Sequence, residues 1–185
     1  LQIPHNFMYI CTMKKLLLIL VFLPMIGLCQ NLEWAVHFGG PNSDDSRGDA
    51  LFIDQNSYVY TTGEFRDTAI FDNANGFFLI SNPATSSVFI SKLDPNGNLV
   101  WAKNFHGSFN GGGSGRSIIV DSSGNIYITG IFQGTVDFDP GIGIFSLTSS
   151  NVFDLFVCKL NSNGDFLWAH NIGVTNYSDA SMTLK

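Results

Sequence analysis

The chain has 185 residues, of which 45% are hydrophobic and 13% are charged, and its formal net charge is −6 at pH 7. A negative surface repels phosphate backbones, so this charge argues against nucleic acid as a partner. Three cysteines occur, Cys11, Cys29 and Cys158. We expect the first two to leave with an N-terminal segment, and the one remaining thiol cannot form an internal disulfide.

The N-terminus carries the pattern of a secretory signal. Residues 1–12 have no organised pattern, and we interpret them as a non-native upstream segment. Two lysines then precede an apolar run, residues 16–26, that is too short to span a bilayer. We therefore predict a signal peptide over residues 13–29, no transmembrane anchor in this segment, and a secreted, extracellular or cell-surface location.

Two outcomes are open at the end of this signal, and cleavage after Cys29 is the one we prefer. The alternative is lipid attachment at Cys29, but a lipobox needs a small residue before its cysteine and Leu28 stands there. Removal of residues 1–29 leaves 7 Lys and Arg against 15 Asp and Glu, a net charge of −8.

Residues 34–100 are repeated in residues 101–167. Aligned without a gap, the two segments share 20 identities in 67 positions. Three tryptophans stand at the same repeat position, each followed by alanine: Trp34, Trp101 and Trp168. A register shared over this length indicates a tandem repeat. We place one partial domain over residues 30–185, with a third repeat that begins at residue 168.

Within one repeat, the local signals are those of β-strands. Residues 117–132 hold two runs rich in Ile, Val and Tyr, separated by a Ser-Ser-Gly-Asn turn. Residues 89–93 and 99–105 flank Asp-Pro-Asn-Gly-Asn, whose proline and glycine suit a hairpin turn. Shorter apolar pieces lie around residues 136–138 and 145–147. No helical period appears after the signal segment.

Each repeat therefore supplies about four short antiparallel strands. The strands have few polar interruptions, so one repeat cannot bury its apolar surface alone and must stack on neighbours. Four-stranded sheets that pack face to face around an axis form a β-propeller. The predicted fold class is all-β, a partial β-propeller of about two blades plus flanking strands.

About two blades cannot close a propeller ring. Residues 32–38 match the last strand of a repeat, and we expect them to complete a final blade. We expect the remaining blades to come from C-terminal sequence beyond this segment. The isolated chain is then predicted to expose apolar blade faces and to associate or aggregate.

Three segments of the repeat resemble a known family. They are Asp-x-x-Gly-Asn-Ile-Tyr-x-Thr-Gly at 121–130, Asp-Phe-Asp-Pro at 137–140 and Lys-Leu-x-x-x-Gly-x-x-x-Trp-Ala at 159–169. These segments are similar to the SBBP repeat, the seven-bladed β-propeller repeat of secreted bacterial proteins. The resemblance implies a scaffold and prescribes no catalytic residues. The first repeat departs at residues 55–58, which lack the Gly-Asn of the second-repeat turn and leave its turn type open.

Oxygen-rich turns raise a calcium hypothesis. Residues 94–98, 121–125 and 161–165 carry Asp, Asn and Ser at short spacing, but they lack the sixth-position glycine and the final glutamate of an EF-hand loop. Hairpin turns require the same residue types, and we interpret the three segments as plain turns. Asp137 and Asp139 form a second candidate cation pair, although the first repeat retains only one of the two carboxylates.

The other reactive residue types show no catalytic pattern. The histidines share no repeat register and no metal-ligand spacing, so we expect surface or strand-end positions for His37, His106 and His170. The glycine-rich run at 111–115 lacks the lysine of a phosphate loop, and we interpret it as a flexible loop. We assign no catalytic and no cofactor-binding residue.

Two repeat positions have both a structural and a functional interpretation. The repeated tryptophans could stack on sugars, but we prefer packing between blades because burial of such a ring stabilises by kilocalories. Cys158 aligns with Ser91 of the first repeat, which favours a small buried side chain over a reactive thiol.

Two classes of function remain. The first, which we prefer, is a non-enzymatic extracellular propeller scaffold that binds or adheres to an unknown protein or glycan as part of a larger secreted or surface protein. The alternative is a propeller enzyme, because Lys-Leu-Asp-Pro-Asn-Gly-Asn-Leu-Val-Trp at 92–101 resembles a quinoprotein dehydrogenase signature. That resemblance is incomplete, since the segment is one residue short and lacks the threonine.

Overall fold

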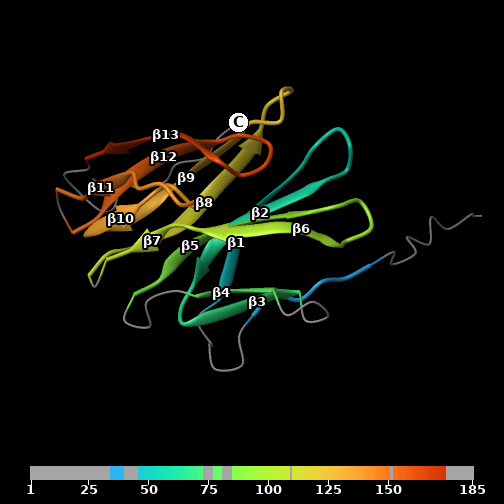
Figure 1. The fold of residues 1–185 in the computed structure, drawn as a ribbon, viewed down its shortest axis with the longest axis horizontal. Helices are drawn as coiled ribbons and strands as arrows, with labels where there is room; N and C mark the ends of the chain where they lie inside the picture. Colours follow the sequence, from blue (N-terminus) through green and yellow to red (C-terminus); the bar gives the residue numbers. More distant parts are fainter. Residues whose placement is uncertain are drawn as a thin grey trace, which may run out of the picture. The chain divides into compact units, whose positions relative to one another are not determined.

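The computed structural model describes residues 34–39, 46–72, 77–80, 85–108, 110–150 and 152–173. These residues form thirteen β-strands and no helix, which confirms the all-β prediction. Two four-stranded antiparallel sheets dominate the fold (Figure 1). The predicted segments 1–12 and 13–29 lie outside the described residues, so the signal peptide stays a prediction.

The two four-stranded sheets have the same strand order. The first sheet runs β1-β2-β5-β6 and the second runs β8-β9-β12-β13, with the chain entering at one edge strand and leaving at the other. Their bounds are β1 Arg47–Ile53, β2 Val59–Phe65, β5 Ser87–Leu93, β6 Leu99–Asn104, β8 Gly112–Val120, β9 Ile126–Gln133, β12 Asp154–Leu160 and β13 Phe166–Ile172. Matching strands are one repeat apart, as the sequence predicted.

A small hairpin is inserted between the second and third strand of each sheet. In the first repeat it is β3 (Thr68–Asp72) with β4 (Phe77–Ile80), and in the second it is β10 (Thr135–Asp137) with β11 (Ser146–Thr148). β10 also pairs with the two-residue strand β7 (His106–Gly107), which directly follows β6. The inserted hairpins therefore form sheets of their own and are not extra blade strands.

The N-terminal described segment repeats the role of β7 but not that of β6. His106 pairs with Asp137 of the second repeat, and the equivalent pair one repeat earlier, Gly39 with Ile70, forms an isolated bridge. The segment thus approaches the first repeat in the way that the end of the first repeat approaches the second. The sequence predicted a regular strand at 32–38, but the described part of it, 34–38, has no ladder pairing.

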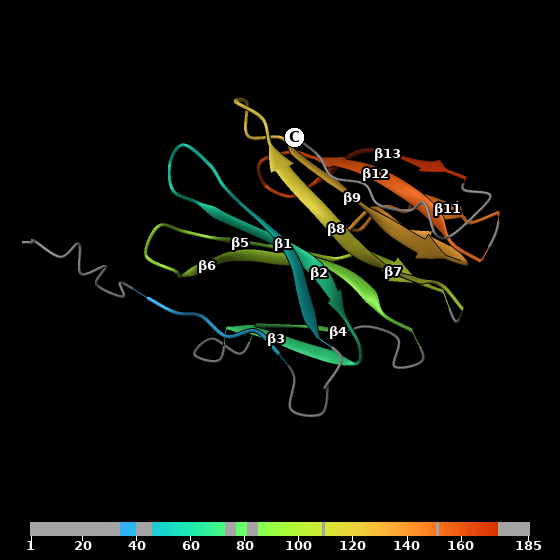
Figure 2. The same ribbon diagram turned by 180° about the vertical axis from the view of Figure 1, so that it is seen from behind.

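The two four-stranded sheets share one hydrophobic core. Tyr60 and Ile90 of the first sheet belong to the same buried cluster as Ile118, Ile126 and Ile128 of the second, and each is at most 3% exposed. β8 lies beside the first sheet in both ribbon views (Figures 1 and 2). Because strand side chains alternate between faces, one face of the first sheet packs directly on the second.

Four phenylalanines per repeat complete this packing. In the second repeat, four rings form a cluster with centroid distances of 4.9 to 6.4 Å, and they are Phe105, Phe132, Phe138 and Phe156. The equivalent first cluster consists of Phe38, Phe65, Phe71 and Phe89. Phe105 follows the last strand of the first sheet, so the segment that leaves one sheet supplies part of the core of the next.

The glycine-rich run at 111–115 is not a flexible loop, and this prediction was wrong. Gly112 to Gly115 form the buried first half of β8. A Cβ on Gly115 would collide with the Thr62 hydroxyl of the first sheet, and one on Gly112 would collide with the Ser86 carbonyl. The glycines therefore let β8 approach its neighbours closely, which is their usual use inside a strand.

The first turn keeps the geometry of its counterpart although its residues differ. Gly124 has φ +81° in the second repeat, and Ser57 adopts φ +63° at the equivalent position. The question that the sequence left open at 55–58 is thus resolved, since both turns place a left-handed residue at the same point. Serine pays a steric cost for this conformation that glycine does not.

Two apolar positions are exposed where their repeat equivalents are buried. Leu51 is 65% exposed, whereas the equivalent Ile118 is 3% exposed against the first sheet. Ile172 is 45% exposed, whereas the equivalent Phe105 is 1% exposed. Ile118 and Phe105 are buried because the two sheets pack on each other at these positions, whereas Leu51 and Ile172 have no such neighbouring sheet among the described residues. Association of the isolated chain remains a prediction.

We expect Phe105→Ala to lower the free energy of unfolding by about 3–5 kcal/mol, because it opens a cavity in a cluster shared by both repeats. Urea denaturation monitored by tryptophan fluorescence measures the change. Ile142→Ala is the control, since Ile142 is fully exposed and its truncation should change stability by no more than about 0.5 kcal/mol. Similar losses for the two variants would show that the shared cluster does not hold the repeats together.

We expect Ser57→Gly to raise the free energy of unfolding by about 1 kcal/mol, because glycine relieves the left-handed conformation. The same denaturation measurement applies. The reciprocal change Gly124→Ser should destabilise by a similar amount, since it imposes on the second repeat the strain present in the first. A neutral or destabilising Ser57→Gly would contradict this account of the turn.

Candidate functional site

Four hairpin turns gather along one edge of the described fold. Val59 at the start of β2 pairs with Leu93 at the end of β5, so the turns at 54–58 and 94–98 leave the same end of the first sheet. In the second sheet, Ile126 pairs with Leu160 in the same way, which places 121–125 and 161–165 together. We call these four turns the turn edge.

The two repeats meet along the turn edge through direct contacts. The Lys103 ammonium of β6 donates to the Gly164 carbonyl at 2.9 Å and lies 3.2 Å from the Asp165 carboxylate. The Lys92 ammonium approaches the Ser162 carbonyl at 3.5 Å. These contacts hold the second-repeat turn at 161–165 over β5 and β6 of the first sheet.

Each turn on this edge is closed by the side chain of its first residue. The Asp121 carboxylate accepts backbone N–H groups of Ser123 and Asn125 at 2.9 and 2.8 Å. The Asp54 carboxylate does the same for Asn56 and Tyr58 at 2.8 and 3.0 Å. Such side-chain capping of a turn by Asp or Asn is the role that the sequence predicted for these residues.

The second turn of each repeat uses one carboxylate and one amide, in opposite order. Asn98 donates its side-chain N–H to Asp94 at 2.9 Å, whereas in the other repeat Asn161 donates to Asp165 at 3.0 Å. The hydrogen bond from Asn98 lowers the pKa of Asp94, and the hydrogen bond from Asn161, aided by Lys103, lowers the pKa of Asp165. Both carboxylates therefore stay ionised at neutral pH.

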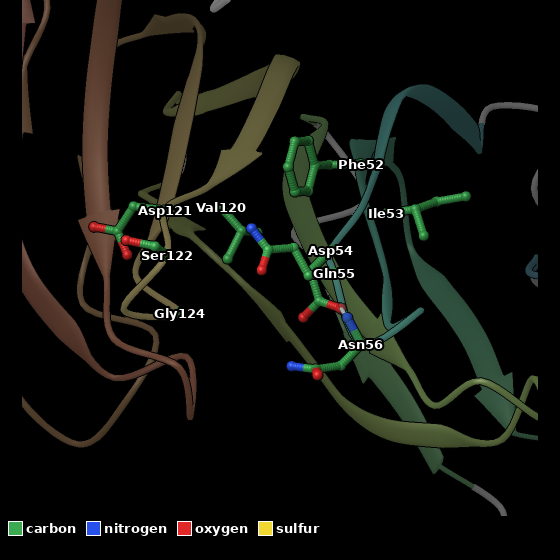
Figure 3. A pocket seen from close by; sticks show the side chains of 9 residues that line it. All are labelled: Phe52, Ile53, Asp54, Gln55, Asn56, Val120, Asp121, Ser122 and Gly124. Atoms are coloured by element: carbon green, nitrogen blue, oxygen red, sulfur yellow. Dashed lines mark hydrogen bonds between the residues drawn. The ribbon is translucent and has the colours of Figure 1, made fainter.

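A cleft of about 160 Å³ opens between the first turns of the two repeats. Phe52 and Val120 form its apolar lining, and Gln55, Asn56 and Ser122 contribute polar side chains. Figure 3 shows the Gln55 and Asn56 side chains extending from the first-repeat turn toward the strand that carries Val120. The cleft is thus built from equivalent positions of successive repeats.

The polar groups around the cleft differ in their hydrogen bonding. Asp121 accepts four hydrogen bonds, because Asn125 and Tyr127 also donate to its second oxygen, at 2.8 and 3.3 Å. Asp54 accepts three, from two backbone groups and from Tyr60 at 3.3 Å. Among the described residues, the side-chain amides of Gln55 and Asn56 have no hydrogen-bond partner.

Two side chains near the cleft have shifted pKa values. Burial, with the neighbouring Asp54 charge, raises the pKa of Tyr60 to about 12, so its hydroxyl stays protonated and available as a donor to Asp54. The hydrogen bond from the Asn125 side chain lowers the pKa of Asp121. The N–H and hydroxyl donors around Asp121 favour the ionised form of that carboxylate.

Asp137 and Asp139, the candidate cation pair, organise their own loop. Asp137 accepts N–H groups of Asp139 and Phe145 at 3.0 and 2.8 Å, and Asp139 accepts from Gly141 at 2.8 Å. The described part of the chain holds no group of three or more His, Cys, Asp or Glu side chains placed to share one metal ion. Calcium binding at Asp137 and Asp139 stays an untested hypothesis.

Trp34 and Trp101 each pack against a turn of the sheet that follows them in the chain, whereas Trp168 packs on Tyr127 within the second sheet. The Trp34 indole donates to the Pro95 carbonyl at 3.0 Å, and a Cβ on Gly97 would come within 2.6 Å of its ring. The Trp101 ring also packs on Gly164, but its buried indole N–H has no hydrogen-bond partner among the described residues. Both rings are partly buried, which agrees with packing between blades. The segment at 92–101 that resembles a quinoprotein signature therefore forms a turn and part of this packing.

The remaining candidate side chains lie apart from the cleft. All three histidines with described positions, His37, His106 and His170, are exposed, as the sequence predicted. Cys158 is fully buried, and burial together with the Asp139 charge raises the pKa of its thiol. A buried protonated thiol is a poor nucleophile, so the structural interpretation of this cysteine is confirmed.

Comparisons with known proteins support a propeller-type repeat. An uncharacterized WD repeat-containing protein of Acanthamoeba polyphaga mimivirus is 30% identical over 137 residues, which cover 68% of this chain and 10% of that protein. This chain thus spans about a tenth of the length of the relative. No protein-family model matches the present chain. The SBBP assignment and the bacterial, secreted origin remain predictions.

In the ranges that the structure describes, no helix has the length and apolar character needed to cross a bilayer.

Sequence reasoning found the turns of the edge but not the cleft. The cleft needs two turns that are 67 residues apart in sequence to lie side by side. One signal in the sequence indicated the cleft. The residues at 55–58 differ from those of the second-repeat turn and place the side-chain amides of Gln55 and Asn56 in the cleft lining. The departure was interpreted only as a question of turn type.

We expect Asp94→Asn to destabilise the fold at pH 7, because it removes the carboxylate that Asn98 and two backbone groups stabilise. The lowered pKa means that this stabilisation is complete above the ordinary Asp pKa of 3.8 and is lost as pH falls through the folded-state value. As pH falls from about 4 to 2, the stability of the variant should therefore decrease less than that of the wild type. Thermal melts across this range measure both effects.

The double exchange Asp94→Asn with Asn98→Asp is the control for that variant. It recreates the arrangement of Asn161 and Asp165, so we expect it to recover most of the lost stability. A double variant as unstable as the single one would show that the carboxylate position, rather than the carboxylate–amide pair, sets the stability of this turn.

Proposed function

We propose that this chain is part of a β-propeller scaffold that binds a protein partner through the turn edge. The observation that carries the proposal is the inter-repeat cleft with its unpartnered amides, located among four turns on one edge of two rigid sheets. Loops on a rigid framework are the usual place for binding residues. A similar protein carries the WD-repeat name, which supports a propeller-type scaffold.

The finer parts of the proposal rest on the sequence. The signal-peptide pattern supports a secreted, extracellular or cell-surface location, and the resemblance to SBBP repeats supports a larger secreted protein. The exposed Leu51 and Ile172, whose repeat equivalents are buried, support closure by further repeats. We place the protein–partner contact on the turn edge, with glycan binding as the competing outcome.

A paired-variant capture experiment tests the proposal. Immobilised wild-type protein and the variant Asn56→Arg are incubated with extracellular fluid from the source, and retained proteins are quantified by mass spectrometry. Asn56 is exposed at the cleft, so we expect arginine there to block the cleft and to reduce retention of a specific partner at least fivefold. A reconstituted complex of the purified partner with the wild type then confirms direct contact.

Asn110→Arg is the matched control. Asn110 is exposed at the opposite end of β8 from the turn edge, so the same substitution there should leave the retained partner unchanged. Equal losses for the two arginine variants, or retention of the same partner by all three proteins, would place binding elsewhere. Saturable retention of a glycan instead of a protein would overturn the choice of partner.

A further inference from the structure

We propose that the cleft between the first turns of the two repeats binds a basic side chain, arginine or lysine, of the protein partner. This inference rests on the proposed function and deepens it, because it names the chemical group that enters the site. Three features of the cleft carry it: a set of free acceptors, an apolar surface for an alkyl stem, and a lack of basic residues in the lining.

The first feature is a set of oxygen acceptors on the first-repeat turn. A carboxylate can accept about four hydrogen bonds, and Asp54 accepts three, so one lone pair remains on the oxygen that faces Tyr60. The side-chain carbonyls of Gln55 and Asn56 add two acceptors without partners among the described residues. An ammonium or guanidinium group carries only donors, so it matches this set.

Comparison with the second-repeat turn explains why the open acceptor positions lie on the first-repeat turn. Asn125 donates its side-chain N–H to Asp121 and fills the fourth acceptor position of that carboxylate. Tyr58 stands at the equivalent position of the first repeat and has no amide to donate, which leaves Asp54 unsaturated. The open carboxylate position and the two long amides therefore come from the same departure at 55–58.

The second feature is an apolar surface beside these acceptors. Phe52 and Val120 are partly buried and line the cleft from the two repeats. Figure 3 shows the Phe52 ring above the amides and Val120 beside the Gln55 amide, whereas Ile53 points away from them. Lysine and arginine lay their methylene stems on apolar surface and keep the charged head at polar groups, which fits this division.

The third feature is the charge around the cleft. Among the described residues that line it there is no lysine, arginine or histidine. Two basic groups of the turn edge have other contacts: Lys103 binds Asp165 and Gly164, and Lys92 lies over the rings of Tyr58 and Tyr60 at 4.6 and 5.2 Å. The whole chain has a net charge of −6. A basic partner segment is therefore attracted before contact and meets no basic group in the cleft.

Nuclear magnetic resonance titration tests the proposal with a defined probe. The peptide acetyl-Gly-Arg-Gly-amide is added to the ¹⁵N-labelled chain at low ionic strength, and acetyl-Gly-citrulline-Gly-amide serves as the neutral probe of the same shape. We expect saturable shifts of backbone amides at 52–56 and 120–124 with the arginine peptide only. The affinity should fall as salt is added, because the contact is electrostatic and partly exposed.

Two matched variants separate the cleft from charge in general. Asp54→Asn should weaken binding of the arginine peptide about threefold to fivefold. The turn should persist, since Asn161 caps an equivalent turn with its amide oxygen at 2.9 Å. Asp67→Asn removes one charge from an exposed position beyond the opposite end of β2, outside the turn edge, and should leave the affinity unchanged.

Several results would overturn the inference. They are equal binding of the citrulline peptide, equal effects of the two variants, shifts that map outside the cleft, or no saturable shifts with the arginine peptide. The outcome is separable from the proposed function. A partner that is lost on Asn56→Arg but bound normally by Asp54→Asn would keep the protein-binding scaffold and reject a basic side chain as its contact group.

Discussion

The structure depends on a hydrophobic cluster that neither four-stranded sheet completes alone. Phe105 follows the last strand of the first sheet but packs with Phe138 and Phe156 of the second repeat, at 5.0 and 5.9 Å between ring centroids. Phe38 performs the same function one repeat earlier. Burial of a phenylalanine contributes a few kilocalories per mole, a large fraction of the stability of a small domain. The repeats must therefore lie in tandem contact to be stable.

This packing determines where the turns lie. Stacking of equivalent sheets places equivalent turns next to each other, and pairing of the second and third strand brings two turns of each repeat to one edge. The caps provided by Asp54, Asp94, Asp121 and Asn161 fix the shape of these turns. The result is a row of short rigid loops, which a scaffold can vary for binding without loss of its core.

The first-repeat turn shows such variation at a measurable cost. Ser57 adopts a left-handed conformation that Gly124 adopts freely, and Tyr58 leaves the Asp54 cap with one fewer hydrogen bond than Asp121. Departures from the locally favoured residue are expected at functional positions, because binding is selected there against stability. The same turn projects Gln55 and Asn56 into the cleft, so the cost and the candidate binding groups occur together.

The sequence by itself determined the strands, the turns and the tandem repeat. These features are local or periodic: alternation of apolar residues marks a strand, Asp, Asn and Gly mark a turn, and a shared register over residues 34–167 reveals the repeat. The buried Cys158 and the exposed histidines also followed from repeat position and spacing. Such signals do not depend on which distant segments meet.

Only the tertiary structure decided the role of Gly112 to Gly115, the separate hairpins β3–β4 and β10–β11, and the cleft. Glycine reads as loop in the sequence, but here it is required because β8 passes too close to Thr62 for a side chain. The cleft exists because two turns one repeat apart face each other across the packed sheets. Both depend on the distance between segments remote in sequence, which is set by side-chain packing between the two sheets and has no local or periodic signature.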